Sequence, residues 1–183
     1  MRLGIDLDGV VANFTEGWVT RYNEDFGASL SPEDVTTWGA MTEIAHFADM
    51  EEFWSWAAAS SRPTIFRHLP IYPGALDAIK RLSARHDIVI VTAKPNARAD
   101  EDTRAWIADV GLPASEVHIT EEKWRIDCDV YLDDAPHQLR ELTLHRPDRV
   151  VCRFVRPWNQ PYPGTRDVRD WDEFVSLVDQ VWC

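Results

Sequence analysis

Cysteine is scarce in this sequence, and its spacing fits neither a disulfide framework nor a metal site. The three cysteines, Cys128, Cys152 and Cys183, are odd in number and lack the close pairs of a zinc knuckle. Free, reduced thiols are the simplest interpretation, and they are typical of cytoplasmic proteins. We therefore expect a cytoplasmic protein that folds without disulfides.

Long hydrophobic runs are also missing. A membrane-spanning helix needs roughly 20 consecutive apolar residues, and no run in this chain of 183 residues approaches that length. The N-terminus does not resemble a signal peptide, because Asp6 and Asp8 interrupt its apolar run. We expect no membrane partner, and the length suits one domain with a small inserted cap.

Positive charge is in short supply, because 19 Lys and Arg residues face 31 Asp and Glu residues for a net charge of −12. This balance argues against a broad surface for binding a nucleic acid polymer. A small phosphorylated ligand would instead need a local positive site, built from a metal ion and one or two basic side chains.

Strand-like and helix-like spacings of apolar residues alternate along most of the chain. Residues 88–91 are apolar and β-branched, as in a strand buried on both faces, whereas apolar residues recur at helical spacing between residues 11 and 26. The predicted strands cover residues 2–7, 88–91, 117–119, 129–132 and 149–154, and the predicted helices cover residues 11–27, 74–85, 98–110, 136–144 and 170–181. This alternation predicts an α/β fold with a doubly wound, mostly parallel, Rossmann-like sheet.

The stretch from residue 28 to residue 70 has a different character. Its short helical pieces are broken by residues such as Pro32 and Pro63, and it is rich in aromatic side chains. We interpret it as the main part of a small helical cap inserted after the first strand. The predicted division is a Rossmann-like catalytic core of residues 1–14 and 71–183, with a cap of residues 15–70.

Polar residues gather where the predicted strands end, and ligands of open parallel sheets bind at that edge. They are Asp6, Asp8 and Gly9 after the first strand, Thr92 and Ala93 after the second, Lys123 in a short helical stretch, and Asp133 and Asp134 after the fourth. Hydrolysis of a phosphate ester needs such groups, because a nucleophile, a proton donor and positive charge must converge on phosphorus. The strand ends therefore predict a phosphate site.

Two carboxylates from the first strand suit two roles in this chemistry. Asp6 and Asp8 lie two residues apart, so both could face one pocket from an extended segment. One would attack phosphorus, and the other would protonate the leaving group and later deprotonate water. Two carboxylates and an anionic substrate need a hard cation, and Mg²⁺ is the natural choice. Asp133 and Asp134 would complete its binding site.

The phosphoryl oxygens themselves need donors. Gly9 permits a tight turn whose backbone amides point at phosphate, while Thr92 offers a hydroxyl and Lys123 a charge. With the neighbouring Ala93, these are the predicted phosphate-binding residues. Lys94 follows directly, and from the sequence it either adds charge near the phosphate or faces solvent.

Each of these features alone has a simpler explanation. An Asp-x-Asp sequence is more often a turn or a cap, Asp133 and Asp134 could cap a helix beginning at Pro136, and a lone lysine is usually solvated. What favours an active site is their combination, in the order and at the strand ends that a single site requires.

These residues resemble the four motifs of the haloacid dehalogenase superfamily. Asp6-Leu7-Asp8-Gly9-Val10 is similar to the first motif, Thr92 to the second, Lys123 to the third, and Asp133-Asp134 to the fourth. The resemblance extends along nearly the whole chain and implies the doubly wound fold. Aspartate at both first-motif positions looks like a phosphohydrolase rather than a dehalogenase.

Within the superfamily, the chain looks most like the 5′(3′)-deoxyribonucleotidase branch, through residues 6–14, 72–76 and 156–159. The resemblance implies that Asp6 is phosphorylated and that Asp8 is the acid and base, with Thr92 and Lys123 holding phosphate. It also implies that magnesium is bound by Asp6, by the carbonyl of Asp8, and by the fourth-motif aspartates. Which of Asp133 and Asp134 touches the metal directly is left open.

Aromatic residues gather in and before the predicted cap. Stacking against a nucleobase is one role for them, and filling the core of a small cap is the other. Phe14 and Trp18 are the predicted substrate contacts, because the helix that carries them starts directly after the catalytic loop.

The sequence therefore predicts a magnesium-dependent phosphatase that forms an aspartyl-phosphate and acts on (deoxy)nucleoside monophosphates. One alternative is a phosphatase for another small phosphate ester, such as a sugar phosphate. A non-catalytic phosphate-binding module is a further alternative, but it would have no need of the full set of acidic and basic residues. A homodimer is left open.

Overall fold

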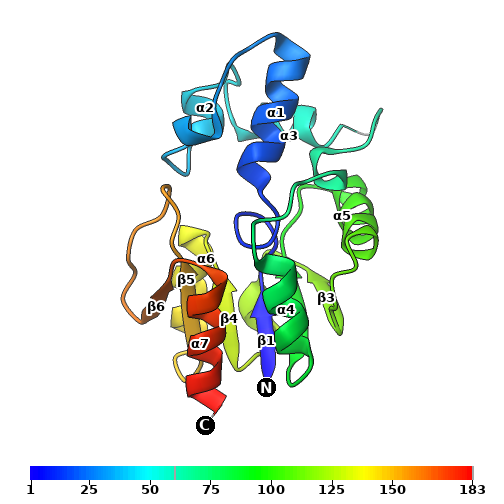
Figure 1. Ribbon diagram of the computed structural model, residues 1–183. Helices are drawn as coiled ribbons and strands as arrows, with labels where there is room; N and C mark the ends of the chain where they lie inside the picture. Colours follow the sequence, from blue (N-terminus) through cyan, green and yellow to red (C-terminus); the bar gives the residue numbers. More distant parts are fainter. Residues whose placement is uncertain (60, 183) are drawn as a thin grey trace.

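A single parallel sheet forms the centre of the protein in the computed structural model, which describes residues 1–59 and 61–182. Within that part of the chain the sheet has six strands, in the order β3-β2-β1-β4-β5-β6 (Figure 1). The strands are β1 (Arg2–Ile5), β2 (Asp87–Thr92), β3 (Glu116–Ile119), β4 (Val130–Asp133), β5 (Val150–Phe154) and β6 (Thr165–Val168). Because β1 lies between β2 and β4, the strand order reverses direction there, at the switch point where ligands of such sheets bind.

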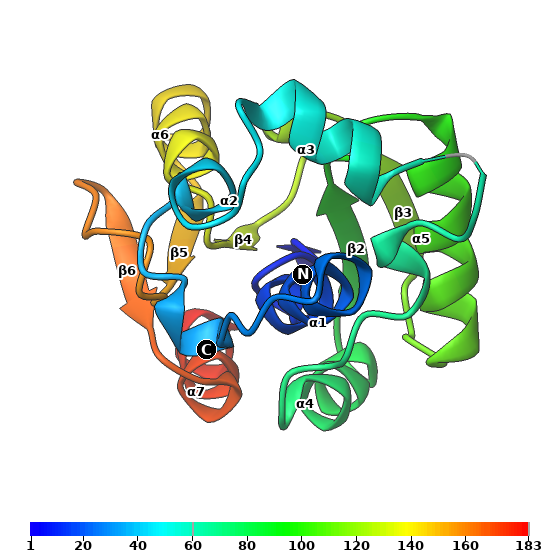
Figure 2. The ribbon, with the colours of Figure 1, turned by 90° about the horizontal axis from the view of Figure 1, so that it is seen from above.

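Helices cover both faces of the sheet, as the sequence predicts for a doubly wound fold. They are α1 (Phe14–Phe26), α2 (Ala40–Glu43), α3 (Met50–Ala57), α4 (Ala75–Ser83), α5 (Ala97–Asp109), α6 (Pro136–His145) and α7 (Trp171–Trp182), with the 3₁₀ turns η1 (Pro32–Asp34), η2 (Ile65–Arg67) and η3 (Lys123–Arg125). Helices α6 and α7 lie on opposite sides of β5 (Figure 2). Among the residues described, no helix combines the length and the apolar character needed to cross a membrane.

Strand β2 shows why the apolar runs form central strands. Ile88 and Ile90 belong to the larger hydrophobic cluster, whereas Val89 and Val91 belong to the smaller one. Successive side chains of a strand point to opposite faces, so a strand buried on both faces must be apolar throughout. This strand was predicted correctly from its β-branched sequence.

Two details differ from the prediction. Residues 165–168 form β6, an edge strand that was not predicted, because three of its four residues are polar and only Val168 is buried. Helix α1 begins at Phe14 rather than at residue 11. The backbone N–H groups of residues 10, 11 and 12 all donate to the Leu7 carbonyl, so this segment is a tight loop rather than the first turn of the helix.

The segment between β1 and α4 carries α1, α2 and α3 beyond the carboxyl ends of the strands (Figure 1). Its buried aromatic residues, including Trp18 and Phe53, belong to the same hydrophobic cluster as Leu3 and Ile5 of β1. The division into a core and a cap stays a prediction, because this cluster runs continuously through both parts.

Candidate active site

The loop after β1 brings its polar residues towards β4. The Asp6 backbone N–H donates to the Leu132 carbonyl at 3.0 Å, which continues the pairing of the two strands by one residue. Gly9 has φ +78°, and a Cβ at this position would lie 2.2 Å from Oδ2 of Asp134. The loop therefore requires glycine, both for its left-handed backbone and for its close approach to that carboxylate.

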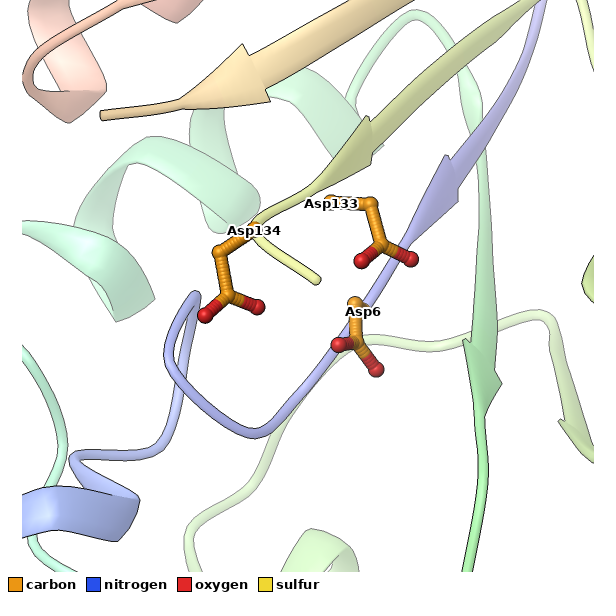
Figure 3. Close-up of side chains that lie close together, drawn as sticks. All are labelled: Asp6, Asp133 and Asp134. Carbon is orange, nitrogen blue, oxygen red and sulfur yellow. The ribbon is translucent and has the colours of Figure 1, made fainter. Parts of the chain in front are cut away.

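Three carboxylates meet at the ends of β1 and β4. Oxygen atoms of Asp6, Asp133 and Asp134 lie within 4.8 Å of one another, and the three residues are 5%, 2% and 2% exposed (Figure 3). Burying several carboxylates together is costly unless cations compensate their charge. The prediction that these residues share one site agrees with this geometry.

Lys123 supplies part of that compensation. Its Nζ lies 3.0 Å from Oδ1 of Asp6 and 2.7 Å from Oδ2 of Asp133, and the side chain is 4% exposed. Burial alone would lower the pKa of Lys123, but the Asp133 and Asp6 carboxylates outweigh it and raise the pKa. Lys123 contacts two of the three carboxyl groups, so its single charge cannot balance the cluster when all three are ionised.

The pKa values of Asp133, the last residue of β4, and of Asp134, directly after it, show the cost of ionising all three groups. Burial raises the pKa of Asp133 to about 6, with Lys123 opposing the rise and Asp6 adding to it. Burial also raises the pKa of Asp134 well above its usual range, and the Asp6 and Asp133 carboxylates add to that rise. Hard oxygen donors with unmet negative charge fit a divalent cation such as Mg²⁺.

A hydrogen-bond network from β5 and the loop after it holds Asp134 in place. Trp158 Nε1 donates to Oδ2 of Asp134 at 2.7 Å, and Asn159 Nδ2 donates to the Asp134 carbonyl at 2.8 Å. Arg153 in turn donates through Nη1 to Oδ1 of Asn159 at 2.9 Å. No role was predicted for these residues from the sequence, although Trp158 and Asn159 lie in one of the stretches that resemble the deoxyribonucleotidase branch.

Asp8 lies outside the three-carboxylate cluster and pairs with Lys94. Lys94 Nζ donates to Oδ2 of Asp8 at 2.7 Å and to Oγ1 of Thr92 at 2.9 Å, and the Lys94 side chain is 1% exposed. The alternative in which Lys94 faces solvent is therefore wrong. Burial raises the pKa of Asp8, and the Lys94 ammonium opposes that rise.

A cavity of about 810 Å³ joins these groups to the helical segment. Of the predicted site residues, those lining it are Asp6, Asp8, Gly9, Phe14, Trp18, Thr92, Ala93, Lys123 and Asp134. Asp133 lies beneath the lining, where its Oδ1 accepts from the Ala135 backbone N–H at 2.9 Å. Trp38 and Trp54, from the segment predicted as a cap, line the opposite part of the same cavity.

The two predicted substrate contacts differ in accessibility. Phe14 is partly exposed at the cavity, with its ring stacked 5.8 Å from that of Phe66. Trp18 borders the cavity but has 0% of its surface exposed, and its ring packs edge-on against Phe53 at 6.0 Å. A ligand would therefore meet Phe14 directly, and Trp18 only after its neighbours moved.

The chain carries Asp-x-Asp directly after β1, a threonine as the last residue of β2, and a pair of aspartates at the end of β4. On a doubly wound sheet, this arrangement defines a hydrolase of the haloacid dehalogenase superfamily. Residues 1–181 match the model of the family described as "5' nucleotidase, deoxy (Pyrimidine), cytosolic type C protein". The chain belongs to this family and is thus a phosphoric monoester hydrolase of the 5′-nucleotidase kind.

Individual relatives agree with this assignment. The chain is 29% identical to a 5′(3′)-deoxyribonucleotidase of Clostridium acetobutylicum over 98% of its own length and 95% of that protein's. It is 26% identical to a putative 5′(3′)-deoxyribonucleotidase of Chlorobaculum tepidum over 76% and 72% of the two lengths. Among solved structures, a magnesium-bound putative HAD-hydrolase of Bacillus subtilis has the same fold, with a TM-score of 0.67 at 15% identity and coverage of 97% and 98%.

Proposed function

We propose that this protein is a magnesium-dependent phosphatase that hydrolyses (deoxy)nucleoside monophosphates through an aspartyl-phosphate on Asp6. The observation that carries the proposal is the position of Asp6. Its carboxylate lines the cavity, lies within the three-carboxylate cluster and contacts Lys123. A nucleophile at this point has positive charge beside it for the phosphoryl oxygens and an acid, Asp8, two residues away.

The chain's own residues would divide the reaction between them. An oxygen of Asp6 bonds to phosphorus while the ester bond breaks, and Asp8 gives its proton to the departing oxygen. Asp8 then takes a proton from a water molecule as that water attacks phosphorus, and the bond to Asp6 breaks to release phosphate. Thr92, Lys123 and the backbone amide of Ala93 would hold the phosphoryl oxygens. The Gly9 backbone N–H, predicted to point at phosphate, instead donates to the Ala12 carbonyl at 2.9 Å.

The metal would sit among the buried carboxylates. Asp6, Asp133 and Asp134, with the carbonyl of Asp8, are the residues that would hold it. When bound, Mg²⁺ supplies positive charge that offsets both these carboxylates and the phosphoryl group. The negative charge that Lys123 alone cannot balance supports this assignment.

The lining of the cavity supports a substrate with one phosphate and an uncharged aromatic part. Among the lining residues described, the only Lys and Arg side chains are Lys94 and Lys123, and both are already paired with carboxylates. Phe14, Trp38 and Trp54 offer aromatic surface elsewhere in the cavity. Nucleobases stack on such rings, and the relatives named above are deoxyribonucleotidases, whereas a sugar phosphate would leave these rings without a partner.

A substrate panel tests the assignment. With Mg²⁺ present, kcat/KM is expected to be at least about tenfold higher for deoxynucleoside monophosphates than for ribose 5-phosphate or glucose 6-phosphate, because only the nucleotides carry a base to stack. Phe14→Ala should raise KM for the nucleotides by about 5- to 150-fold, the equivalent of 1–3 kcal/mol of stacking, and leave KM for ribose 5-phosphate nearly unchanged.

Phe26→Ala is the matched control, because Phe26 lies on the same helix, is 45% exposed and does not line the cavity. Equal or better turnover of the sugar phosphates would defeat the nucleotide assignment and favour the alternative of another small phosphate ester. It would leave the phosphatase chemistry standing.

The raised pKa of Asp133 gives a pH prediction for magnesium. A carboxyl whose pKa is raised on folding destabilises the metal-free protein as pH rises from about 4 through about 6, whereas a bound cation favours the ionised form. Below about pH 6 protons therefore compete with the metal, and its apparent affinity is expected to fall about tenfold per pH unit for each proton displaced. The rise in Tm on adding Mg²⁺ should be larger at about pH 7.5 than at about pH 5.

The magnesium-induced difference is the quantity to measure, because burial lowers the pKa of His86 and His137 and these groups also change the Tm over this range. Asp133→Asn should reduce both the magnesium effect and its pH dependence. An identical shift at both pH values in the unaltered protein would contradict a metal held by these carboxyls.

We further propose that residues 15–70 act as a cap over the site, because Trp38 and Trp54 of this segment share one cavity with Asp6. A cytoplasmic location is supported by Cys128 and Cys152, which are both free thiols. Cys183 lies outside the described residues. The homodimer stays a prediction.

A further inference from the structure

Lysine is rare in this chain, and the lysines differ in how far they are buried. The three lysines are Lys80, Lys94 and Lys123. Lys80 is exposed on α4, whereas the side chains of Lys94 and Lys123 are 1% and 4% exposed at the two ends of the carboxylate site. Lys123 is accounted for by its contacts with Asp6 and Asp133, so the role of Lys94 is the question that remains.

The ammonium of Lys94 has no hydrogen left for a phosphate. Its three N–H groups have three acceptors, namely Oδ2 of Asp8 at 2.7 Å, Oγ1 of Thr92 at 2.9 Å and the Ala93 carbonyl at 3.1 Å. The Phe66 ring covers it at 4.7 Å from the ring centroid. Because Thr92 accepts from Lys94, the hydroxyl hydrogen of Thr92 is directed elsewhere and is free to meet a phosphoryl oxygen.

The carboxyl group of Asp8 is therefore asymmetric. Its Oδ2 is held by Lys94, whereas its Oδ1 is buried and has no hydrogen-bond partner among the residues that the structure describes. Asp8 lines the cavity. Because Lys94 is itself fixed by three acceptors and by the Phe66 ring, it sets the orientation in which the Asp8 carboxyl group meets the cavity.

We infer that Lys94 is a positioning residue that holds Oδ2 of Asp8 and thereby fixes the orientation of the Asp8 carboxyl group for proton transfer. The inference rests on the proposed function, in which Asp8 is the acid and the base. In the first step the proton of the Asp8 carboxyl group moves to the ester oxygen as its bond to phosphorus breaks and the Asp6–phosphorus bond forms. In the second, the Asp8 carboxylate takes a proton from water as the water oxygen bonds to phosphorus and releases Asp6.

Lys94→Met tests this role, because methionine keeps the apolar length of the side chain and removes the ammonium. We expect kcat for a deoxynucleoside monophosphate to fall about 10- to 100-fold, a part of what acid–base catalysis contributes, with KM within about threefold of the unaltered enzyme. Lys80→Met is the matched control and should leave both constants unchanged.

A substrate with a good leaving group distinguishes a loss of Asp8 positioning from general damage to the active site. The phenolate of p-nitrophenyl phosphate departs without a proton, so its release in the first step should keep a rate within about threefold of the unaltered enzyme. The second step still needs Asp8 as a base, so Lys94→Met should show a burst of p-nitrophenolate followed by slow turnover. A first step slowed equally for both substrates would overturn the inference.

A double variant covers the case in which Lys94→Met leaves an unpaired buried carboxylate and fails to fold. Asp8→Asn/Lys94→Met removes both charges, and its kcat should match that of Asp8→Asn within about threefold, because no carboxyl is left to position. A much slower double variant would overturn the inference. So would a rise in both the nucleotide KM and the inhibition constant of inorganic phosphate in Lys94→Met, which is the signature of a phosphate-binding lysine.

Failure of the proposed function would look different. In that case the unaltered enzyme itself would show no magnesium-dependent hydrolysis of either substrate. Activity of the unaltered enzyme on both substrates, combined with any of the contrary results for the Lys94 variants, would reject only the role of Lys94.

Discussion

Asp6→Asn is expected to abolish turnover, with kcat lower by at least about 10⁴-fold for every phosphate ester tested. An amide has the shape of the carboxyl group but is a poor nucleophile, so the covalent step has no route. The buried cluster would lose one of its three crowded carboxylates, and we therefore expect no loss of Tm. The measurement is steady-state hydrolysis of a deoxynucleotide, together with a thermal unfolding curve for each protein.

Asp77→Asn is the matched control, because Asp77 is exposed on α4 and away from the cavity. Activity of Asp6→Asn near that of the unaltered enzyme would rule out Asp6 as the nucleophile. The same loss in Asp77→Asn would show that the measurement reports damage to the protein and not the chemistry of the site.

Removal of magnesium is expected to have an effect of similar size. With excess chelator, hydrolysis should fall to background, because Asp6, Asp133 and Asp134 would then repel both one another and the substrate phosphate. Adding Mg²⁺ beyond the chelator should restore the full rate. Ca²⁺ should restore little of it, because this ion prefers more ligands at longer distances.

Thermal unfolding at each stage shows whether the chelated protein is still folded. A folded protein that keeps its full rate in excess chelator would contradict a catalytic metal. A rate that returns with Ca²⁺ as fully as with Mg²⁺ would instead contradict the choice of metal.

The central part of the fold was predictable from the sequence for a clear physical reason. Residues 88–91 are apolar at every position, and only a strand covered on both faces can bury all of them. Strand β6 has no such signal, because residues 165–168 are mostly polar and lie at the edge of the sheet. β6 forms because it pairs with the neighbouring strand β5, and the residues of β6 alone do not indicate this pairing.

The site residues were predictable to the extent that they follow strands. Asp6 and Asp133 come at the ends of β1 and β4, and neighbouring parallel strands bring such residues to one edge. The partner of Asp8 was not predictable in this way. Lys94 lies two residues beyond β2, where the direction of a side chain depends on the loop, and the sequence left its role open between phosphate and solvent.

The residues that hold Asp134 in place could not be predicted from the sequence for a similar reason. Trp158 and Asn159 are 24 and 25 residues further along the chain, and they reach Asp134 only because the loop after β5 folds back over the site. The burial of the Trp18 side chain could not be predicted from the sequence either. Helical spacing places it one turn beyond Phe14, but packing against Phe53 closes it off from the cavity.

The most direct test of the proposed chemistry is to trap the phosphorylated enzyme. Rapid quenching during turnover of a deoxynucleotide, followed by borohydride reduction, converts an aspartyl-phosphate to homoserine, which peptide mass spectrometry locates in the chain. We predict homoserine at position 6 and at no other aspartate, and none when substrate is left out. Its appearance at Asp8 instead, or its absence from an enzyme that is visibly turning over, would contradict a covalent intermediate on Asp6.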